Sequence, residues 1–199
     1  MNRSGRLATF CGLGSVAALV VGAMDAAANF GSTAASGNTE VSLGNNRWHS
    51  WSFWTSDSNW RTALNDAATY SYGNVTDLVV SRAGDNQSSD VRLITADFGP
   101  IGELARTSCP SDGTRGGSDP TEWCWNQWIK INQNSALLPT DATGRKSLMC
   151  HEFGHTVGLR HPAGSDPHDT CMVAANWPYT GLSHSNPYNS EWDQINANY

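Results

Sequence analysis

Charged residues are scarce in this sequence. They make up 15% of its 199 residues, and 12 Lys and Arg stand against 18 Asp and Glu, which gives a formal net charge of −6. The basic residues form no run, so the composition argues against a nucleic-acid-binding protein with a basic surface. Glu, Lys and Leu do not recur in heptads, which excludes a coiled coil. The surface must therefore be polar largely without charge, through the many Asn, Ser, Thr and Gly residues.

Apolar and aromatic residues, by contrast, are sufficient for a core. Hydrophobic residues make up 39% of the chain and aromatic residues 10%, including nine tryptophans. This composition does not fit a wholly disordered chain. A chain of this length can bury a single sizeable core, so one globular domain is predicted.

The N-terminus has the pattern of a secretory signal peptide. Arg3 and Arg6 place positive charge ahead of an apolar stretch from Leu7 to Ala23, and Ala26–Ala28 offers a small-residue cleavage site. A membrane anchor is the alternative, but the apolar stretch is short and interrupted by glycines. No other segment of the sequence approaches a membrane span. We therefore expect residues 1–28 to be a signal peptide and the protein to be secreted and extracellular, without membrane attachment after cleavage.

The cysteines indicate disulfide bonds. Of the five, Cys11 lies in the predicted signal peptide, which leaves Cys109, Cys124, Cys150 and Cys171. An even number of cysteines in an exported protein predicts two disulfides, for which three pairings are possible. The simplest pairing joins sequence neighbours, Cys109 with Cys124 and Cys150 with Cys171.

The hydrophobic pattern predicts a layered α+β domain. Alternation from Trp48 to Trp54 indicates a first strand, and a helix that Ser58 can cap follows it and ends at Gly73. Further strands are expected at 78–81, 91–95, 103–107 and 128–131, and further helices at 145–158 and 189–196. One face of the first helix is apolar, through Trp60, Ala63, Leu64, Ala67 and Ala68. The Gly- and Ser-rich residues 29–46 are predicted to be an N-terminal extension or a short pro-segment.

The side chains best suited to chemistry lie in one predicted helix and the turn after it. The run from 151 to 161 reads His-Glu-x-x-His-x-x-Gly-x-x-His. On an α-helix, His151 and His155 lie about 40° apart around the axis, so both imidazoles can reach one metal ion. Glu152 is rotated by about 100° and can flank a water molecule on that metal. Gly158 can take a left-handed conformation that brings His161 round as a third ligand, and three nitrogen ligands with one open position define a catalytic zinc site.

Two alternative interpretations of this run carry less weight. The histidines could be ordinary residues of a helix, but this composition would produce the eleven-residue pattern by chance in only about one in 80,000 sequences. Glu191, in the last predicted helix, could instead be the third ligand. His161 already satisfies that need at the right spacing.

The pattern resembles that of the metzincin clan of zinc endopeptidases. Metzincins have a Met-turn beneath the zinc site, and Met172, eleven residues after His161, is the match. The resemblance implies that residues 47–199 form the metallopeptidase catalytic domain, of a compact type similar to matrixins or small secreted bacterial metzincins. It implies a twisted mixed β-sheet with two long helices, a zinc cleft, and a small irregular C-terminal subdomain that ends in a helix.

Three details depart from particular metzincin groups. Snapalysin-like enzymes carry Asp where this chain has His161. Astacins and serralysins place a tyrosine two residues after the Met-turn methionine, where this chain has Ala174. Once residues 1–28 are removed, no cysteine precedes the predicted domain, so the thiol latch of matrixins is not expected.

The resemblance implies a secreted zinc-dependent endopeptidase that hydrolyses peptide bonds of extracellular proteins. Zn²⁺ would bind the attacking water and Glu152 would be its general base, while the predicted edge strand at 103–107 would bind the substrate as an added strand. The alternative is a Trp-rich secreted module that binds carbohydrate or cell wall and has an inactive zinc site. The intact Glu152 argues against that module. A monomer is expected, and the substrate-binding residues stay unassigned.

Other residues give weaker signals. His49 shares a face with two predicted core aromatics and is predicted to be a packed or surface histidine. His168 and His184 are expected on the surface near the cleft. Calcium binding by loop aspartates is conceivable for a metzincin, but no ligand register in this sequence supports it. A tryptophan cluster around Cys124 could stack on a ligand, although core packing is the better prediction for Trp123, Trp125 and Trp128.

Overall fold

The computed structural model describes residues 44–100, 103–109, 114–115, 124–161, 170–172, 187 and 189–199. The predicted signal peptide and nearly all of the extension at 29–46 lie outside these residues, as do Trp123, His168, Ala174 and His184. Within the described ranges, no helix has the length and apolar character needed to cross a membrane.

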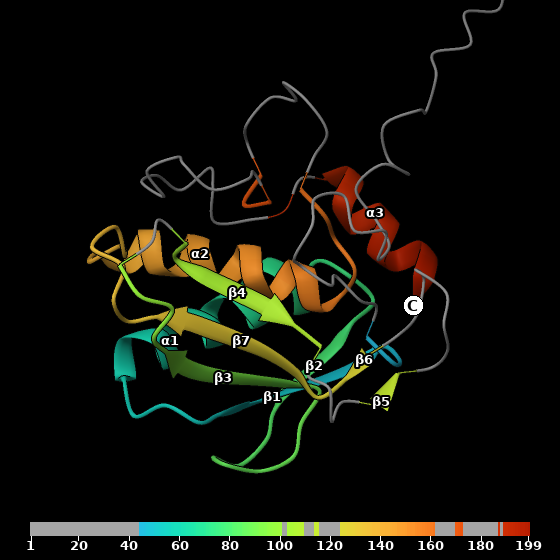
Figure 1. Cartoon of the computed structure of the whole chain (residues 1–199). Helices are drawn as coiled ribbons and strands as arrows, with labels where there is room; N and C mark the ends of the chain where they lie inside the picture. The colour runs from blue at the N-terminus through green and yellow to red at the C-terminus, as the bar shows by residue number, and fades with distance from the viewer. Residues whose placement is uncertain are drawn as a thin grey trace, which may run out of the picture.

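A five-stranded mixed sheet forms the centre of the fold, in the order β2-β1-β3-β7-β4 (Figure 1). The first four are mutually parallel, and β4 runs antiparallel to β7 at the edge of the sheet. A second, two-stranded sheet pairs β5 with β6 and was not predicted. The strand bounds are β1 Trp48–Phe53, β2 Val79–Arg82, β3 Val91–Ala96, β4 Ala105–Ser108, β5 Thr114–Arg115, β6 Cys124–Trp125 and β7 Gln127–Asn132. Each strand of the large sheet lies within two residues of its predicted position.

The first predicted helix is present, but it begins one residue earlier than predicted. It consists of α1 (Ser58–Asp66), which continues directly into the π-helix η2 (Ala67–Gly73). Ser58 is the first helical residue rather than the cap. The cap is Asp57, whose carboxylate accepts hydrogen bonds from the backbone N–H of Asn59 and Trp60 at 2.9 and 3.4 Å. The Asp57 carboxylate thus satisfies two otherwise unpaired helix N–H groups, the role that was predicted for the Ser58 hydroxyl.

The other two helices are also close to their predicted positions. Helix α2 (Ala142–Thr156) begins three residues before Arg145, because the Asp141 carboxylate caps it by accepting the backbone N–H of Gly144 at 2.8 Å. Helix α3 (Asn189–Asn198) extends two residues beyond its prediction. The boundaries of both helices therefore follow the local caps more than the hydrophobic pattern.

The core lies between the sheet and the helices α1, η2 and α2, which pack together on one side of it (Figure 1). Side chains of alternate strand residues point toward these helical elements, which cover this face of the sheet. The buried side chains include Trp51, Phe53, Val91, Leu93, Ile129 and Ile131 from the sheet and Trp60, Ala63, Leu64, Ala67 and Ala68 from the first helix. The predicted apolar face of that helix is thus confirmed.

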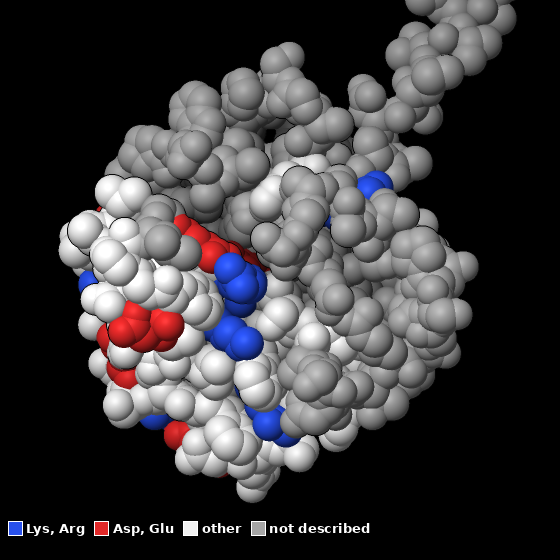
Figure 2. All heavy atoms as spheres, in the orientation of Figure 1, with Lys and Arg blue, Asp and Glu red and all other residues white. Residues whose placement is uncertain are grey.

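Charged side chains are few on the face of the molecule shown in Figure 2, and acidic and basic ones lie next to one another. Three ion pairs are present among the described residues. Arg61 and Arg82 both contact Asp85, and Arg106 contacts Glu103. The described part of this surface accordingly carries little charge, as the composition predicts.

Both predicted disulfides are present. Cys109 pairs with Cys124 and Cys150 pairs with Cys171, with Cα atoms 6.0 and 5.9 Å apart. The first disulfide joins the chain after the edge strand β4 to β6. The second joins α2 to the described segment 170–172, directly beside the predicted Met-turn methionine.

Candidate metal centre

Three imidazole rings converge at the end of α2. The Nε2 atoms of His151, His155 and His161 lie 3.0, 3.1 and 3.2 Å from one another. His151 and His155 are buried on one face of the helix, and His161 follows the helix. Among the described residues, this is the only group of three or more metal-ligand side chains close enough to share one ion.

The turn after α2 brings His161 to the other two histidines. Gly158 has φ of 98°, a left-handed conformation that glycine adopts without strain. The N–H of Leu159 donates to the carbonyl of Gly154 at 2.9 Å, and the N–H of Gly158 donates to the carbonyl of His155 at 3.3 Å. These two bonds form a Schellman motif, which reverses the chain direction at the helix end. The predicted left-handed conformation of Gly158 is therefore confirmed.

The hydrogen bonds of the outer ring nitrogens fix the tautomers of two histidines. The Nδ1 of His151 lies 2.8 Å from the carbonyl oxygen of Cys171, and the Nδ1 of His155 lies 2.7 Å from that of Leu159. A carbonyl oxygen only accepts, so each Nδ1 must carry the proton and each Nε2 must present a lone pair. Two lone pairs therefore face each other at 3.1 Å. They cannot hydrogen-bond to each other, and a Lewis acid between them resolves the conflict.

This donor set fits a zinc ion. Tetrahedral zinc with Zn–N bonds of about 2.0–2.1 Å needs ligand nitrogens about 3.3–3.4 Å apart, close to the separations of these three Nε2 atoms. Three neutral imidazoles leave the fourth tetrahedral position open. The carbonyls that hold the two Nδ1 protons also orient both rings toward the common point.

Burial keeps the three imidazoles neutral. It lowers the pKa of His155 to about 3 and that of His151 well below the ordinary value, and the neighbouring histidines lower both further. The pKa of the less buried His161 is lowered by the same cause. A metal must compete with protons for these nitrogens, so low pKa values favour metal binding.

Glu152 lies on α2 beside His151, and its carboxylate has a specific partner. The hydroxyl of Thr107, on the edge strand β4, lies 2.7 Å from Glu152 Oε2 and 2.9 Å from the Glu152 backbone carbonyl. Both residues are buried, with 4% and 1% of their surface exposed. Burial raises the pKa of Glu152 to about 7, and hydrogen bonding from Thr107 opposes that rise. A carboxyl group of this kind can take up and return a proton near neutral pH.

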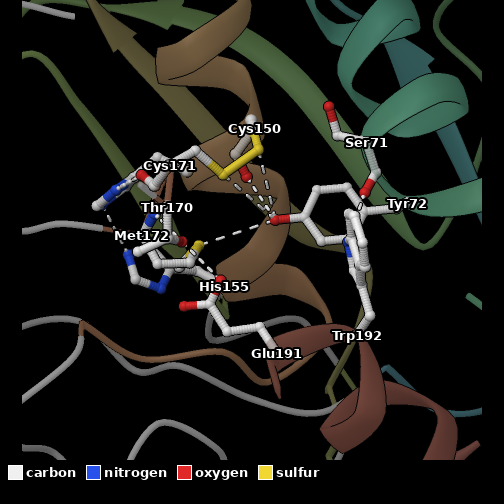
Figure 3. Close-up of a disulfide and its surroundings, with 10 residues drawn as sticks. Ser71, Tyr72, Cys150, His155, Thr170, Cys171, Met172, Glu191 and Trp192 are labelled. Carbon is white, nitrogen blue, oxygen red and sulfur yellow. Dashed lines mark hydrogen bonds between the residues drawn. A yellow bond between two sulfur atoms is a disulfide. The ribbon is translucent and has the colours of Figure 1, made fainter. Parts of the chain in front are cut away.

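Met172 lies in a tightly packed layer against α2 (Figure 3). It is fully buried, and its sulfur lies 3.8 Å from the hydroxyl of Tyr72. A side-chain carbon at Gly154 would collide with the Met172 sulfur and would lie 2.5 Å from the Tyr72 hydroxyl. Gly154 therefore lets Met172 and Tyr72 approach the helix backbone one residue before His155.

Glu191 lies beside the Met172 segment and outside the histidine group. Its carboxylate accepts the hydroxyl of Thr170 at 2.6 Å, and the same Thr170 oxygen accepts the backbone N–H of Met172 at 3.0 Å (Figure 3). The buried Glu191 thus anchors the Met172 segment to α3. This placement favours His161 over Glu191 as the third ligand.

The Cys150–Cys171 disulfide connects this segment to the histidines. Cys150 directly precedes His151, and Cys171 supplies the carbonyl that holds the Nδ1 proton of His151. Tyr72 donates its hydroxyl proton to the carbonyl of Cys150 at 2.7 Å and lies 3.9 Å from both sulfurs (Figure 3). One covalent bond therefore fixes a metal-ligand candidate together with its hydrogen-bond acceptor.

The weaker candidates of the sequence have other environments. His49 is fully buried, and its Nε2 lies 3.0 Å from the Thr156 hydroxyl on the far side of α2 from the histidine group. Trp125 and Trp128 are half-buried. The described loop aspartates have protein partners: Asp85 binds two arginines, Asp90 accepts from Ser50, and Asp97 accepts from Gly99 and Asn134.

Sequence reasoning missed Thr107 and Tyr72. Both lie far from α2 in the sequence, and only the packing of β4 and η2 against that helix brings them to the site. Thr107 is the one fully buried residue of β4, whose other residues are half-buried. A strand of four residues is too short for its hydrophobic pattern to reveal this. Nothing in the pattern around Tyr72 distinguishes it from a core aromatic.

Comparison with known proteins gives partial matches. No family model matches the chain. The sequence is 27% identical to Serralysin G of Dickeya chrysanthemi over 104 residues, which is 51% of this chain and 21% of that protein. This chain therefore aligns with about a fifth of that relative. Among solved structures, High choriolytic enzyme 1, a hatching-enzyme zinc protease of the medaka fish Oryzias latipes, covers 60% of this chain and 48% of its own length. Its sequence identity is 14%, and its TM-score of 0.33 is too low to establish a common fold.

Proposed function

We propose that this protein is a secreted zinc-dependent endopeptidase of metzincin type. The observation that carries the proposal is the convergence of the Nε2 atoms of His151, His155 and His161 within 3.2 Å of one another, with the Glu152 carboxylate on the adjacent helical position. Three neutral imidazoles with an open fourth position and a nearby carboxylate are typical of a hydrolytic zinc site, because a structural site closes the fourth position with a protein ligand.

In this mechanism the three histidines hold the metal and Glu152 moves the proton. Zinc bound there would activate a water molecule and polarise the scissile carbonyl. Glu152 takes the proton from the attacking water as general base and delivers it to the leaving amine as general acid. Its raised pKa of about 7 suits both steps, because the group must be ionised first and protonated afterwards.

The edge position of β4 supports a peptide as the substrate. Its far side pairs with no other strand among the described residues. An extended peptide can therefore add to this edge as a further strand, through main-chain hydrogen bonds. Thr107 on the same strand touches Glu152, so a peptide bound there would lie beside the general base.

The similarity to Serralysin G supports the assignment at the level of the protease class. The two disulfides support an oxidising, extracellular location. We propose that residues 1–28 are a signal peptide, that 29–46 are an extension or a short pro-segment, and that 47–199 form the catalytic domain. The substrate is a protein or peptide, and the enzyme acts as a monomer.

A peptidase assay on the full secreted chain tests the proposal. The wild-type protein should cleave a mixed peptide library, lose this activity to a chelator, and regain it when zinc is added. Glu152→Gln should keep its zinc and its fold but lose activity by about 100- to 10,000-fold, because it lacks the proton acceptor.

Equal activity of Glu152→Gln and the wild type would contradict the mechanism. A zinc-bound wild type that cleaves no peptide but binds glycans would favour the carbohydrate- or cell-wall-binding module instead.

A further inference from the structure

Thr107 is the only described residue whose side chain hydrogen-bonds to the Glu152 carboxylate. Its hydroxyl reaches both the carboxylate, at 2.7 Å, and the backbone carbonyl of the same residue, at 2.9 Å. It therefore ties the end of a flexible side chain to the rigid backbone of α2. Without such a tie, the long side chain of a glutamate on a helix has several rotamers available to it.

The position of Thr107 is itself fixed. Its β4 neighbours pair with β7, and Thr107 lies opposite the fully buried Ile129 in that antiparallel ladder. Cys109, the residue directly after β4, is held by its disulfide to Cys124. Only 1% of the Thr107 surface is exposed, so bulk water does not compete for its hydroxyl. A rigid strand thus presents a desolvated hydroxyl to the carboxylate.

The hydroxyl has one proton and two acceptors on the same residue. The shorter of its two distances is to the carboxylate oxygen, so Thr107 donates to the ionised group that would act as general base. The Glu152 backbone carbonyl, at 2.9 Å, keeps the same hydroxyl against α2.

We propose that Thr107 is a positioning residue for Glu152 that holds its carboxyl group in one orientation. This inference rests on the proposed function of Glu152 as general base. Thr107 makes no contact with the substrate or with the metal in this role. It acts through the carboxylate, so its removal should impair the chemical step rather than the binding of peptide or zinc.

Two variants test the proposal. Thr107→Val keeps the branched shape but removes the hydroxyl, and Thr107→Ser keeps the hydroxyl. With zinc content and thermal unfolding measured in parallel, Thr107→Val should lower kcat by about 10- to 100-fold at an unchanged KM, the range expected for loss of a supporting hydrogen bond at a metal site. Thr107→Ser should restore kcat to within about threefold of the wild type. A Thr107→Val kcat within about twofold of the wild type would overturn the proposal and leave the endopeptidase assignment intact.

A second measurement needs no activity. In metal-free protein, Thr107→Val, Glu152→Ala and the double variant form a cycle in the free energy of unfolding. Thr107→Val should destabilise the wild type more than it destabilises Glu152→Ala, because the two side chains interact. Additive effects would overturn the proposal even if the enzyme were inactive on every peptide. Non-additive effects with an inactive wild type would reject the endopeptidase function but retain Thr107 as the residue that holds Glu152.

Discussion

Buried histidines lie on two opposite sides of α2, and their hydrogen bonds give them opposite properties. On one side, His151 and His155 bind backbone carbonyls through Nδ1 and turn the lone pairs of Nε2 toward a shared point. On the other side, the Thr156 hydroxyl donates to the carbonyl of Phe153, so the Nε2 of His49 must donate its proton to Thr156. The Nδ1 of His49 is buried and has no hydrogen-bond partner among the residues that the structure describes.

The difference shows that burial alone does not make a metal ligand. His49 is as buried as His151 and His155, with 0% of its surface exposed against 4% and 2%. What differs is which nitrogen carries the proton and whether other lone pairs meet at the same point. The side of α2 with the histidine group should therefore control metal binding and catalysis. The side with His49 and Phe153 should control stability.

The largest expected effect is on zinc affinity. His155→Ala removes one of the three nitrogens, and should weaken zinc binding by about 70- to 900-fold, since apparent binding free energies of about 10–16 kcal/mol are divided among about four ligands. His49→Gln is the matched control on the other side and should bind zinc as the wild type does. Competition with a chromophoric chelator measures both. Equal losses of zinc affinity in the two variants would show that the two sides of α2 do not differ in metal binding.

The next effect is on stability, from the opposite side of the helix. The Phe153 ring packs edge-on against His49 and Trp51 and at a tilt against Tyr72, with centroids 5.1–6.4 Å apart. Phe153→Ala should lower the free energy of unfolding by about 3–5 kcal/mol, the usual cost of deleting a buried phenyl ring. The folded variant should keep its zinc affinity. Denaturant unfolding measures the stability of the variant, and zinc competition on the same sample measures its zinc affinity. A large loss of zinc affinity would contradict the separate roles of the two sides of α2.

The two disulfides allow a matched test of the same distinction. Replacing Cys150 and Cys171 by Ser, or Cys109 and Cys124 by Ser, opens loops of similar length, 21 and 15 residues. Each pair of substitutions should cost about 3 kcal/mol in the chain-entropy model. Only loss of the Cys150–Cys171 disulfide frees the carbonyl that holds His151, so only that variant should also lose zinc affinity, by about 10- to 100-fold. Equal zinc affinity in both variants would contradict a role for that disulfide at the metal centre.

The smallest expected effect concerns pH. Burial lowers the pKa of His49 from 6.5 to about 4, with Asp90 partly opposing the shift. The unfolded chain therefore binds a proton that the folded chain does not bind between these values. The stability that this provides is complete above pH 6.5 and falls as the pH drops toward 4, by about 3 kcal/mol in all. His49→Gln should flatten this part of the pH dependence of unfolding. An unchanged slope in that variant would show that His49 does not titrate as its burial predicts.

The sequence predicted much of the fold because its signals are local. Alternation marked the strands of the large sheet, the 3.6-residue period marked the buried face of α1 and η2, and Gly158 marked the turn after α2. The cysteine spacing predicted both disulfides. Helix starts were predicted less accurately. With Asp57 and Asp141 as caps, the two helices begin one and three residues earlier than predicted.

The site was predictable in its inner part and not in its surroundings. His151, His155 and His161 are close in the sequence, so helical geometry and one glycine turn bring them together. Thr107 reaches Glu152 across 45 residues, and Tyr72 reaches Cys150 across 78. Such contacts depend on how the sheet and η2 pack against α2, which no local pattern encodes.

Zinc titration of the metal-free protein, followed by bound metal and by peptide hydrolysis together, tests whether the histidine group binds a catalytic zinc ion. We expect the wild type to bind a single zinc ion per chain tightly and its rate of hydrolysis to rise in proportion until that ion is bound, and we expect His155→Ala to show neither behaviour. Tight zinc binding that survives His155→Ala, or peptide hydrolysis that does not follow the bound zinc, would contradict this expectation.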